Sequence, residues 1–254
     1  MTFSEGMARG PIAMLEGRAA LLRLWREYRD LAWAHGLPFF ATTPTRRANR
    51  ARMERAGHGP ELIAQNVALL RSLAQGGPMC VGGLMGCRGD AYTGEGALPR
   101  QEARAFHRWQ AEAFRRAGAD FLLAGILPTA PEAQGMAQAM AETGLPYVLS
   151  LTLRRDGRLV DGTRLCDLIR ETDALLGEGR PAFYMSNGIH PDAVRAALDQ
   201  AFNRCGAVQA RFLGVQANTS PRSFAELDGA KALQGDAPEP WAEAMLRLHR
   251  AHPM

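Results

Sequence analysis

The sequence contains almost no lysine, no long apolar run and no spaced pair of cysteines, and each of these absences argues against a class of protein or site. No apolar stretch approaches the roughly 20 residues needed to span a bilayer, because Gly, Pro and Arg interrupt the longer runs. The first segment, MTFSEGMARGPIAML, lacks the charged-then-apolar order of a signal peptide. We therefore expect a cytoplasmic protein that does not contact membranes. With 254 residues, 46% of them hydrophobic, the chain can bury a full core, and we expect one domain over residues 1–254.

Lysine is almost absent, since Lys231 is the only lysine among the 30 basic residues. A net charge of +4 and a pI near 9.2 would be compatible with nucleic-acid binding. The arginines, however, alternate with acidic residues on expected helix surfaces, as Arg26 and Arg29 do beside Glu27 and Asp30. This alternation indicates solvated helix faces, and we expect no nucleic-acid partner.

The cysteines show no CxxC spacing and no neighbouring histidines; they are Cys80, Cys87, Cys166 and Cys205. In a cytosolic chain we expect them to be free thiols in packed positions. Cys87 differs, because it lies in the segment GCRGD at the expected end of a strand. It could supply one thiolate there, but a single thiolate does not make a zinc site.

Apolar runs alternate with amphipathic stretches, a pattern typical of repeated βα units on a parallel sheet. Short apolar runs bounded by Gly or Pro predict buried strands, and apolar residues at helical spacing predict helices. We expect strands over residues 37–43, 78–86, 120–127, 145–153, 182–187 and 209–217, and helices over residues 16–34, 61–74, 100–117, 131–143, 163–176, 191–203 and 240–251. A (β/α)₈ barrel typically needs about 250 residues. The length therefore fits a complete barrel, but the six strands do not.

The segment Ala182–Pro191 reads AFYMSNGIHP, an apolar run that stops at Ser-Asn-Gly before a helix start. It resembles a strand end of the homocysteine S-methyltransferase family, in which Asn-Cys is followed shortly by His-Pro. That cysteine is one of three thiolates that hold a catalytic zinc in the family. Asn187 and His190 fit the pattern, but Gly188 takes the place of the cysteine. Further segments resemble the family in the same order along the chain: ATTPTRRAN, GCRGDAY, HRWQAEAFRRAGAD, PEAQGMAQA and LSLTLRRDGRLVDGT.

Two segments of the family pattern are missing from the sequence. One is the opening strand, which would precede Met1, and the other is the final strand, whose Gly-Gly-Cys-Cys-Gly supplies the remaining zinc ligands. The resemblance thus implies an α/β fold, a (β/α) barrel of the TIM type that is incomplete, with about six strands. A shortened gene is the alternative to a natural loss. The two open edges would carry Phe39, Phe40, Val208 and Phe212, and we expect a homo-oligomer or a partner protein to cover them.

In the family, zinc keeps the substrate thiol ionised, and the thiolate attacks a methyl group on a sulfonium or quaternary ammonium donor. A free thiol with a pKa near 8.5 is only a few per cent thiolate at neutral pH. Given Gly188 and the missing Cys-Cys pair, we expect neither a metal nor another cofactor. The candidate catalytic residues are then Asp90 and His190. Each has a structural alternative, because Asp90 could cap its own loop and His190 could begin the next helix.

Polar residues at the strand ends would line a small-molecule pocket at the C-terminal face, where TIM-barrel active sites form. The candidates are Thr42, Thr43, Asp90, Tyr92, Ser150, Asn187 and Asn218. Such residues also often cap the following helix. His107 is expected to pack or to face solvent outside the barrel.

We predict a metal-independent, methyltransferase-like enzyme for a small thiol, amine or sulfonium compound. The alternative is a catalytically silent scaffold that completes its barrel through another chain.

Overall fold

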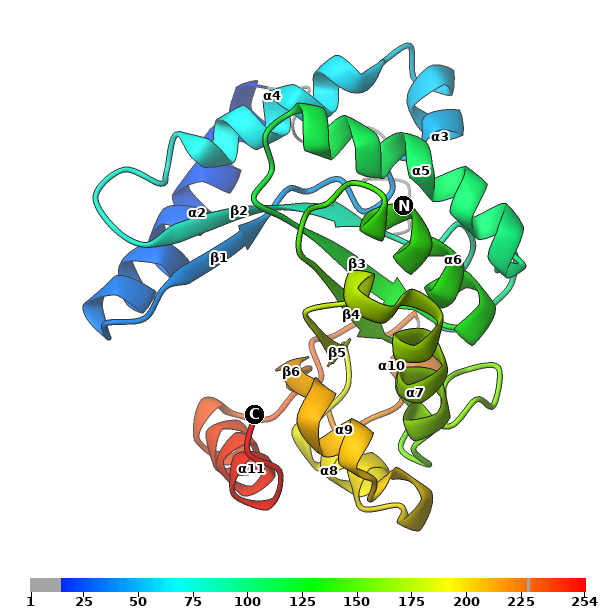
Figure 1. The fold of residues 1–254 in the computed structure, drawn as a ribbon. Helices are drawn as coiled ribbons and strands as arrows, with labels where there is room; N and C mark the ends of the chain where they lie inside the picture. The colour runs from blue at the N-terminus through cyan, green and yellow to red at the C-terminus, as the bar shows by residue number, and fades with distance from the viewer. Residues whose placement is uncertain (1–14, 228) are drawn as a thin grey trace.

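Six parallel strands form one curled sheet in chain order in a computed structural model, which describes residues 15–227 and 229–254 (Figure 1). The strands are β1 (Phe39–Thr42), β2 (Met79–Met85), β3 (Phe121–Leu127), β4 (Tyr147–Leu151), β5 (Phe183–Asn187) and β6 (Phe212–Gln216). Each strand pairs in parallel with the next, and within the described residues β1 and β6 are not paired with each other. The sheet is therefore a half-barrel, which confirms the prediction of an incomplete barrel of the TIM type.

Helices lie along the convex side of the sheet, and the main core fills the space between them and the strands (Figure 1). Large buried side chains of this core include Ile63, Phe114, Met136 and Tyr184. No helix in the described part of the chain is long and apolar enough to cross a bilayer. The helices are α2 (Leu15–Ala34), α3 (Arg50–Arg55), α4 (Pro60–Arg71), α5 (Arg100–Arg116), α6 (Ala130–Ala141), α7 (Leu165–Leu176), η2 (Gly177–Gly179), α8 (Pro191–Leu198), η3 (Ala201–Asn203), α9 (Gly206–Arg211), α10 (Phe224–Leu227) and α11 (Pro238–Ala251).

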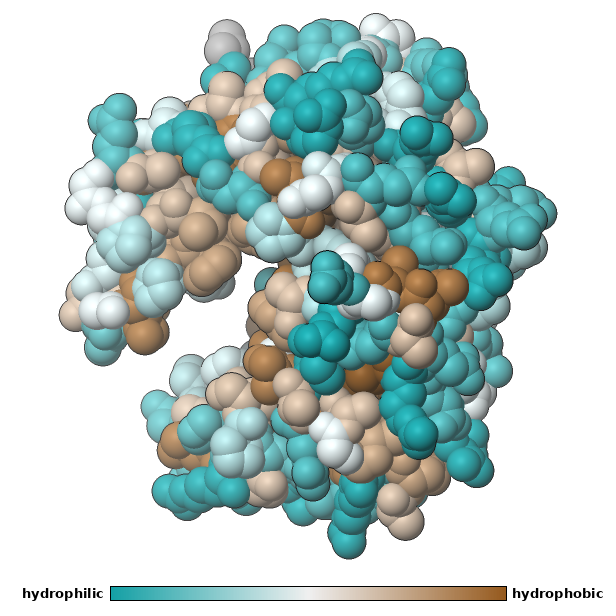
Figure 2. Space-filling view, viewed as in Figure 1, coloured by the Kyte–Doolittle hydropathy of each residue, from teal (hydrophilic) through white to brown (hydrophobic). Residues whose placement is uncertain are grey.

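The concave side of the sheet carries a second, smaller apolar cluster. Successive strand residues point to opposite faces, so Leu122 and Leu149 join the main core while Leu123 and Val148 join the small cluster with Met185. The molecule is hollowed on this side, between the arm with α2 and β1 and the arm with α11 (Figure 2). The concave face is the surface that the interior of a closed barrel would bury.

The predicted elements are found, with two differences near the C-terminal end of the sheet. The expected helix over residues 191–203 ends as α8 at Leu198 and is followed by the short η3. The expected strand over residues 209–217 begins only at Phe212, because residues 206–211 form α9. Val208 of α9 and Phe212, the first residue of the edge strand β6, have buried side chains, whereas Phe40 of the other edge strand, β1, is 62% exposed. The short helices α3 and α10 were not expected.

The prediction that all four cysteines are free thiols is wrong for two of them. Cys166, near the start of α7, and Cys205, just before α9, form a disulfide with a Cα–Cα distance of 6.5 Å. The two residues lie 39 positions apart, a separation that no local spacing rule connects. Cys80 and Cys87 are free, and Cys87 is buried.

Candidate functional site

The turn after β5 is built around Gly188, the position at which the family resemblance would predict a metal-binding cysteine. Gly188 has a φ of +77°, a conformation that glycine adopts without strain. Its N–H donates to the Gln216 carbonyl at the end of β6, at 2.9 Å. A Cβ atom at this position would lie 3.3 Å from Cε2 of Phe224 and 3.8 Å from the Tyr92 hydroxyl. Both the backbone and its neighbours therefore favour the absence of a side chain.

An aromatic pair closes the space next to Gly188. Tyr92 comes from the loop between β2 and α5, and Phe224 is the first residue of α10. Their rings stack with centroids 3.2 Å apart and an interplanar angle of 20°. Segments that are 132 positions apart in the chain thus meet over the C-terminal ends of the strands (from residue 92 to residue 224).

Asp90 shapes the loop that carries Tyr92. Its Oδ1 accepts hydrogen bonds from the backbone N–H groups of Tyr92 and Thr93, both at 2.8 Å. Partial burial alone would raise the pKa of this carboxyl, but these hydrogen bonds and the nearby Arg47 outweigh it and lower the pKa. Asp90 is therefore an ionised loop cap, which is the structural alternative named for it above.

A buried pair behind the site holds both ends of the same loop. His107 of α5 and Glu132 of α6 are fully buried, with His107 Nε2 3.1 Å from Glu132 Oε1. The Glu132 carboxylate also accepts the N–H of Arg88 at 2.7 Å and that of Leu98 at 3.4 Å. His107 is thus neither at the surface nor a mere packing residue, because it supports the carboxylate that anchors residues 88–98.

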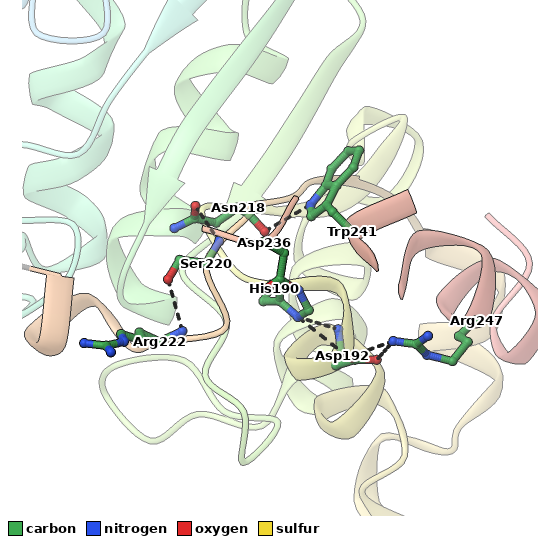
Figure 3. A network of polar contacts seen from close by, with 8 residues as sticks. All are labelled: His190, Asp192, Asn218, Ser220, Arg222, Asp236, Trp241 and Arg247. Atoms are coloured by element: carbon green, nitrogen blue, oxygen red, sulfur yellow. Dashed lines mark hydrogen bonds and ion pairs between the residues drawn. The ribbon is translucent and has the colours of Figure 1, made fainter. Parts of the chain in front are cut away.

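His190 belongs to a polar network that fastens the segment after β6 (Figure 3). Its Nδ1 accepts the N–H of Asp192, which makes it the N-cap of α8, and its Nε2 lies 3.1 Å from Asp236 Oδ2. Asp192 in turn pairs with Arg247 of α11. The His190 side chain is only 4% exposed, so both of its ring nitrogens are engaged in structure.

The two asparagines are also engaged locally. Asn187 Nδ2 donates to Gln216 Oε1 at 2.7 Å, a contact between the ends of β5 and β6. Asn218 Oδ1 accepts the N–H of Ser220, and its carbonyl accepts the indole N–H of Trp241, as Figure 3 shows. Within the described residues no hydrogen bond joins either asparagine to Asp90. Asn218 donates its N–H to the Ile189 carbonyl next to Gly188, at 3.0 Å, and Tyr92 approaches the same turn from a distant part of the chain.

Thr42 and Thr43 cannot both line one pocket, because neighbouring strand residues face opposite sides. Thr42 shares the concave side with Phe40, whereas Thr43 is fully buried and its hydroxyl contacts Thr45 at 2.7 Å and the Leu84 N–H at 3.2 Å. The expectation for Thr43 is corrected accordingly. Ser150 lies two residues after Val148 in β4, so its side chain points to the same, concave side of the sheet. Its buried hydroxyl has no hydrogen-bond partner within the described residues.

The donor set at these strand ends does not fit a catalytic zinc. Glycine at position 188 offers no ligand, and the described residues contain no cluster of three or more His, Cys, Asp or Glu side chains that could hold a metal ion. Burial and the nearby Glu132 carboxylate raise the pKa of the Cys87 thiol to about 11, so it stays protonated near neutral pH. A catalytic zinc site needs three protein ligands.

Two residues of this site, Arg46 and Phe224, were not among the candidates predicted from the sequence. Burial raises the pKa of the Tyr92 hydroxyl, and the Arg46 guanidinium offsets part of that rise. Phe224 lies on a helix of four residues that has no periodicity to detect. The only sequence signal was the position of Arg46-Arg47 directly after a strand end, in the segment ATTPTRRAN.

Comparisons with known proteins agree with this fold. The sequence profile described as homocysteine S-methyltransferase matches residues 34–251. The homocysteine methyltransferase MmuM from Escherichia coli is similar in three structures. Its metallated form has a TM-score of 0.63 at 24% identity, covering 91% of this chain and 88% of that one. Its apo form has a TM-score of 0.60 at 22% identity, covering 97% and 93%. The oxidised form gives 0.62 at 23%, covering 86% and 89%. No curated protein matches the sequence.

Proposed function

Because the chain belongs to the homocysteine S-methyltransferase family, we propose that it is a methyltransferase-like enzyme that works without a catalytic zinc. Its substrate is a small thiol or amine, and its methyl donor is a sulfonium or quaternary ammonium compound. The reaction takes place at the C-terminal ends of the strands, beside Gly188 and Tyr92. The methyl group passes from the cationic donor to a lone pair of the acceptor, the donor leaves as a neutral molecule, and the acceptor proton goes to water.

The observation that carries this proposal is the contact of Tyr92 and Phe224 over Gly188. In place of a metal ligand, the site presents two aromatic rings and a phenol hydroxyl. Aromatic faces attract quaternary ammonium and sulfonium cations, the charge type of the donor. The donor would meet an outer face of the stacked pair, because the inner faces contact each other. Asn187, Thr42 and Ser150 lie on the same side of the sheet. Asn187 and Thr42 are partly exposed there and supply polar contacts, whereas the Ser150 hydroxyl is buried beneath them. In this proposal Asp90 and His190 position the surrounding loops and do not exchange protons with substrate.

Ligand binding and product formation test the proposal separately. Thermal shift with homocysteine, methionine, S-adenosylmethionine, S-methylmethionine and glycine betaine should show stabilisation by at least one compound, since a ligand adds RT ln(1 + [L]/Kd) to the stability. Mass spectrometry of thiol and donor mixtures should then show methyl transfer. Tyr92→Phe should weaken both signals, while Tyr28→Phe on the exposed surface of α2 should change neither. Wild-type protein without any hit would contradict the proposal.

A catalytically silent scaffold remains the second candidate, favoured by the apolar surface around β1. Leu24, Tyr28 and Leu31 of α2 are 47%, 59% and 59% exposed, and Leu37 and Phe40 beside them are 57% and 62% exposed. Such a surface next to an unpaired parallel edge is typical of an interface. We propose that a second copy of the chain covers it. Light scattering should then give about twice 27.6 kDa, and Tyr28→Arg should return the protein to one chain.

A further inference from the structure

The loop between β1 and α3 carries Arg46 and Arg47, and α3 itself carries Arg52 and Arg55. Burial, and after it repulsion from Arg47, Arg55 and Arg46, lowers the pKa of Arg52. The four arginines belong to one short stretch of chain that leads from the end of β1 through α3. Within residues 15–227 and 229–254, none of these four guanidinium groups lies within 4 Å of a carboxylate. Arg50, on the same helix, differs because it pairs with Glu54 at 2.8 Å.

Two of these arginines reach the strand ends. Arg46 packs its side chain against Gly86, where a Cβ atom would lie 2.6 Å from Arg46 Cγ, and its guanidinium contributes to lowering the pKa of the Tyr92 hydroxyl, which burial raises. Arg47 Nη1 donates to the Gly89 carbonyl at 2.9 Å. A guanidinium has five N–H donors, so these anchors fix the direction of each group while using few of its donors.

The carboxylate of Asp90 does not neutralise these arginines. The Arg47 charge contributes to lowering the pKa of Asp90, but Asp90 accepts hydrogen bonds from two backbone N–H groups with its Oδ1 and forms no ion pair with Arg47 within the described residues. Anchored guanidinium groups of like charge repel each other unless an anion lies between them, and their planar donor arrangement matches an oxyanion.

We propose that Arg46, Arg47 and Arg52 form a binding site for an oxyanion, a carboxylate or a phosphate, next to the Tyr92–Gly188 site. In the enzyme this anion is a group of the substrate, a role that rests on the proposed function, whereas the binding itself does not. The site would select substrates that carry such a group within reach of the strand ends.

Calorimetry with inorganic phosphate and with acetate, at constant ionic strength adjusted with chloride, tests the site on the full chain. The wild type should bind at least one of them saturably, and Arg46→Gln and Arg52→Gln should each weaken it by roughly tenfold, the effect of losing one charge-assisted hydrogen bond. Arg50→Gln, a matched change on the same helix, should leave it unchanged. Circular dichroism checks that the variants fold, and the hydrogen bonds of Arg52 in the described part of the chain are made by its backbone, which the substitution keeps.

The outcomes separate the sources of the anion. Saturable binding of phosphate alone assigns a phosphate-bearing ligand, and binding of acetate assigns a carboxylate. If neither anion binds saturably, or if Arg50→Gln weakens binding as much as Arg52→Gln, the arginines are a solvated basic face and the proposal fails. Because methyl transfer is not measured, a failure of the proposed enzyme activity would not change this result.

Discussion

Replacing Gly188 by alanine should cost more stability than the same change at a glycine with the same backbone conformation. Gly188 and Gly118 both have a φ of +77°, but a Cβ atom at Gly118 would meet no atom within 4 Å. An L-residue in this conformation costs roughly 1–2 kcal/mol, and this part is common to both variants. At Gly188 the new Cβ also lies 3.3 Å from Phe224 Cε2, and we expect the crowding to add about 1 kcal/mol.

Urea unfolding with linear extrapolation measures both variants. The extra loss at Gly188 corresponds to a further drop in Tm of roughly 2–4 °C for a chain of this size. Introducing Gly188→Ala into a Phe224→Ala background should remove the extra loss, which a double-mutant cycle reports as a coupling of about 1 kcal/mol. Equal losses for Gly188→Ala and Gly118→Ala would refute the reasoning, because Phe224 would then not cover this turn.

Three further outcomes follow from the structure. Thiol titration of the unfolded chain should find two reactive thiols without reductant and four after reduction, and four thiols before reduction would contradict the Cys166–Cys205 bond. Reducing this bond should lower the free energy of unfolding by about 4 kcal/mol, the chain-entropy estimate for a loop of 39 residues. In the folded protein near neutral pH, Cys87 should resist alkylation because its pKa is about 11, and rapid labelling would count against its burial. Glu132→Ala should destabilise the fold by about 3 kcal/mol, as it leaves His107 and two backbone N–H groups without their partner; a loss below that of a typical surface change would contradict its anchoring role.

The sheet and its helices could be predicted because period-2 and period-3.6 patterns are local properties of the sequence. The start of β6 was misplaced, since residues 206–211 form a short helix before it whose six residues are too few to show a period. The equal treatment of Thr42 and Thr43 failed for a simpler reason. Once a strand is assigned, alternation already places one of two adjacent residues on the far side.

The contacts of the site could be predicted only in part. The Gly188 turn and Tyr92 could be located because they follow strand ends, which meet at one face of a parallel sheet. The stacking of Phe224 on Tyr92, the burial of His107 against Glu132 and the Cys166–Cys205 bond all join distant segments. Residue type at one position does not reveal such pairs, so they require the three-dimensional structure.

Methyl transfer measured before and after removal of metal tests the central proposal most directly. The purified protein is assayed by mass spectrometry with the thiol and donor that bind, then dialysed against a zinc chelator, analysed for zinc and assayed again. We predict well below one zinc per chain at the outset and an unchanged rate of product formation after dialysis. About one zinc per chain, with activity lost on chelation and restored by added zinc, would contradict the proposal.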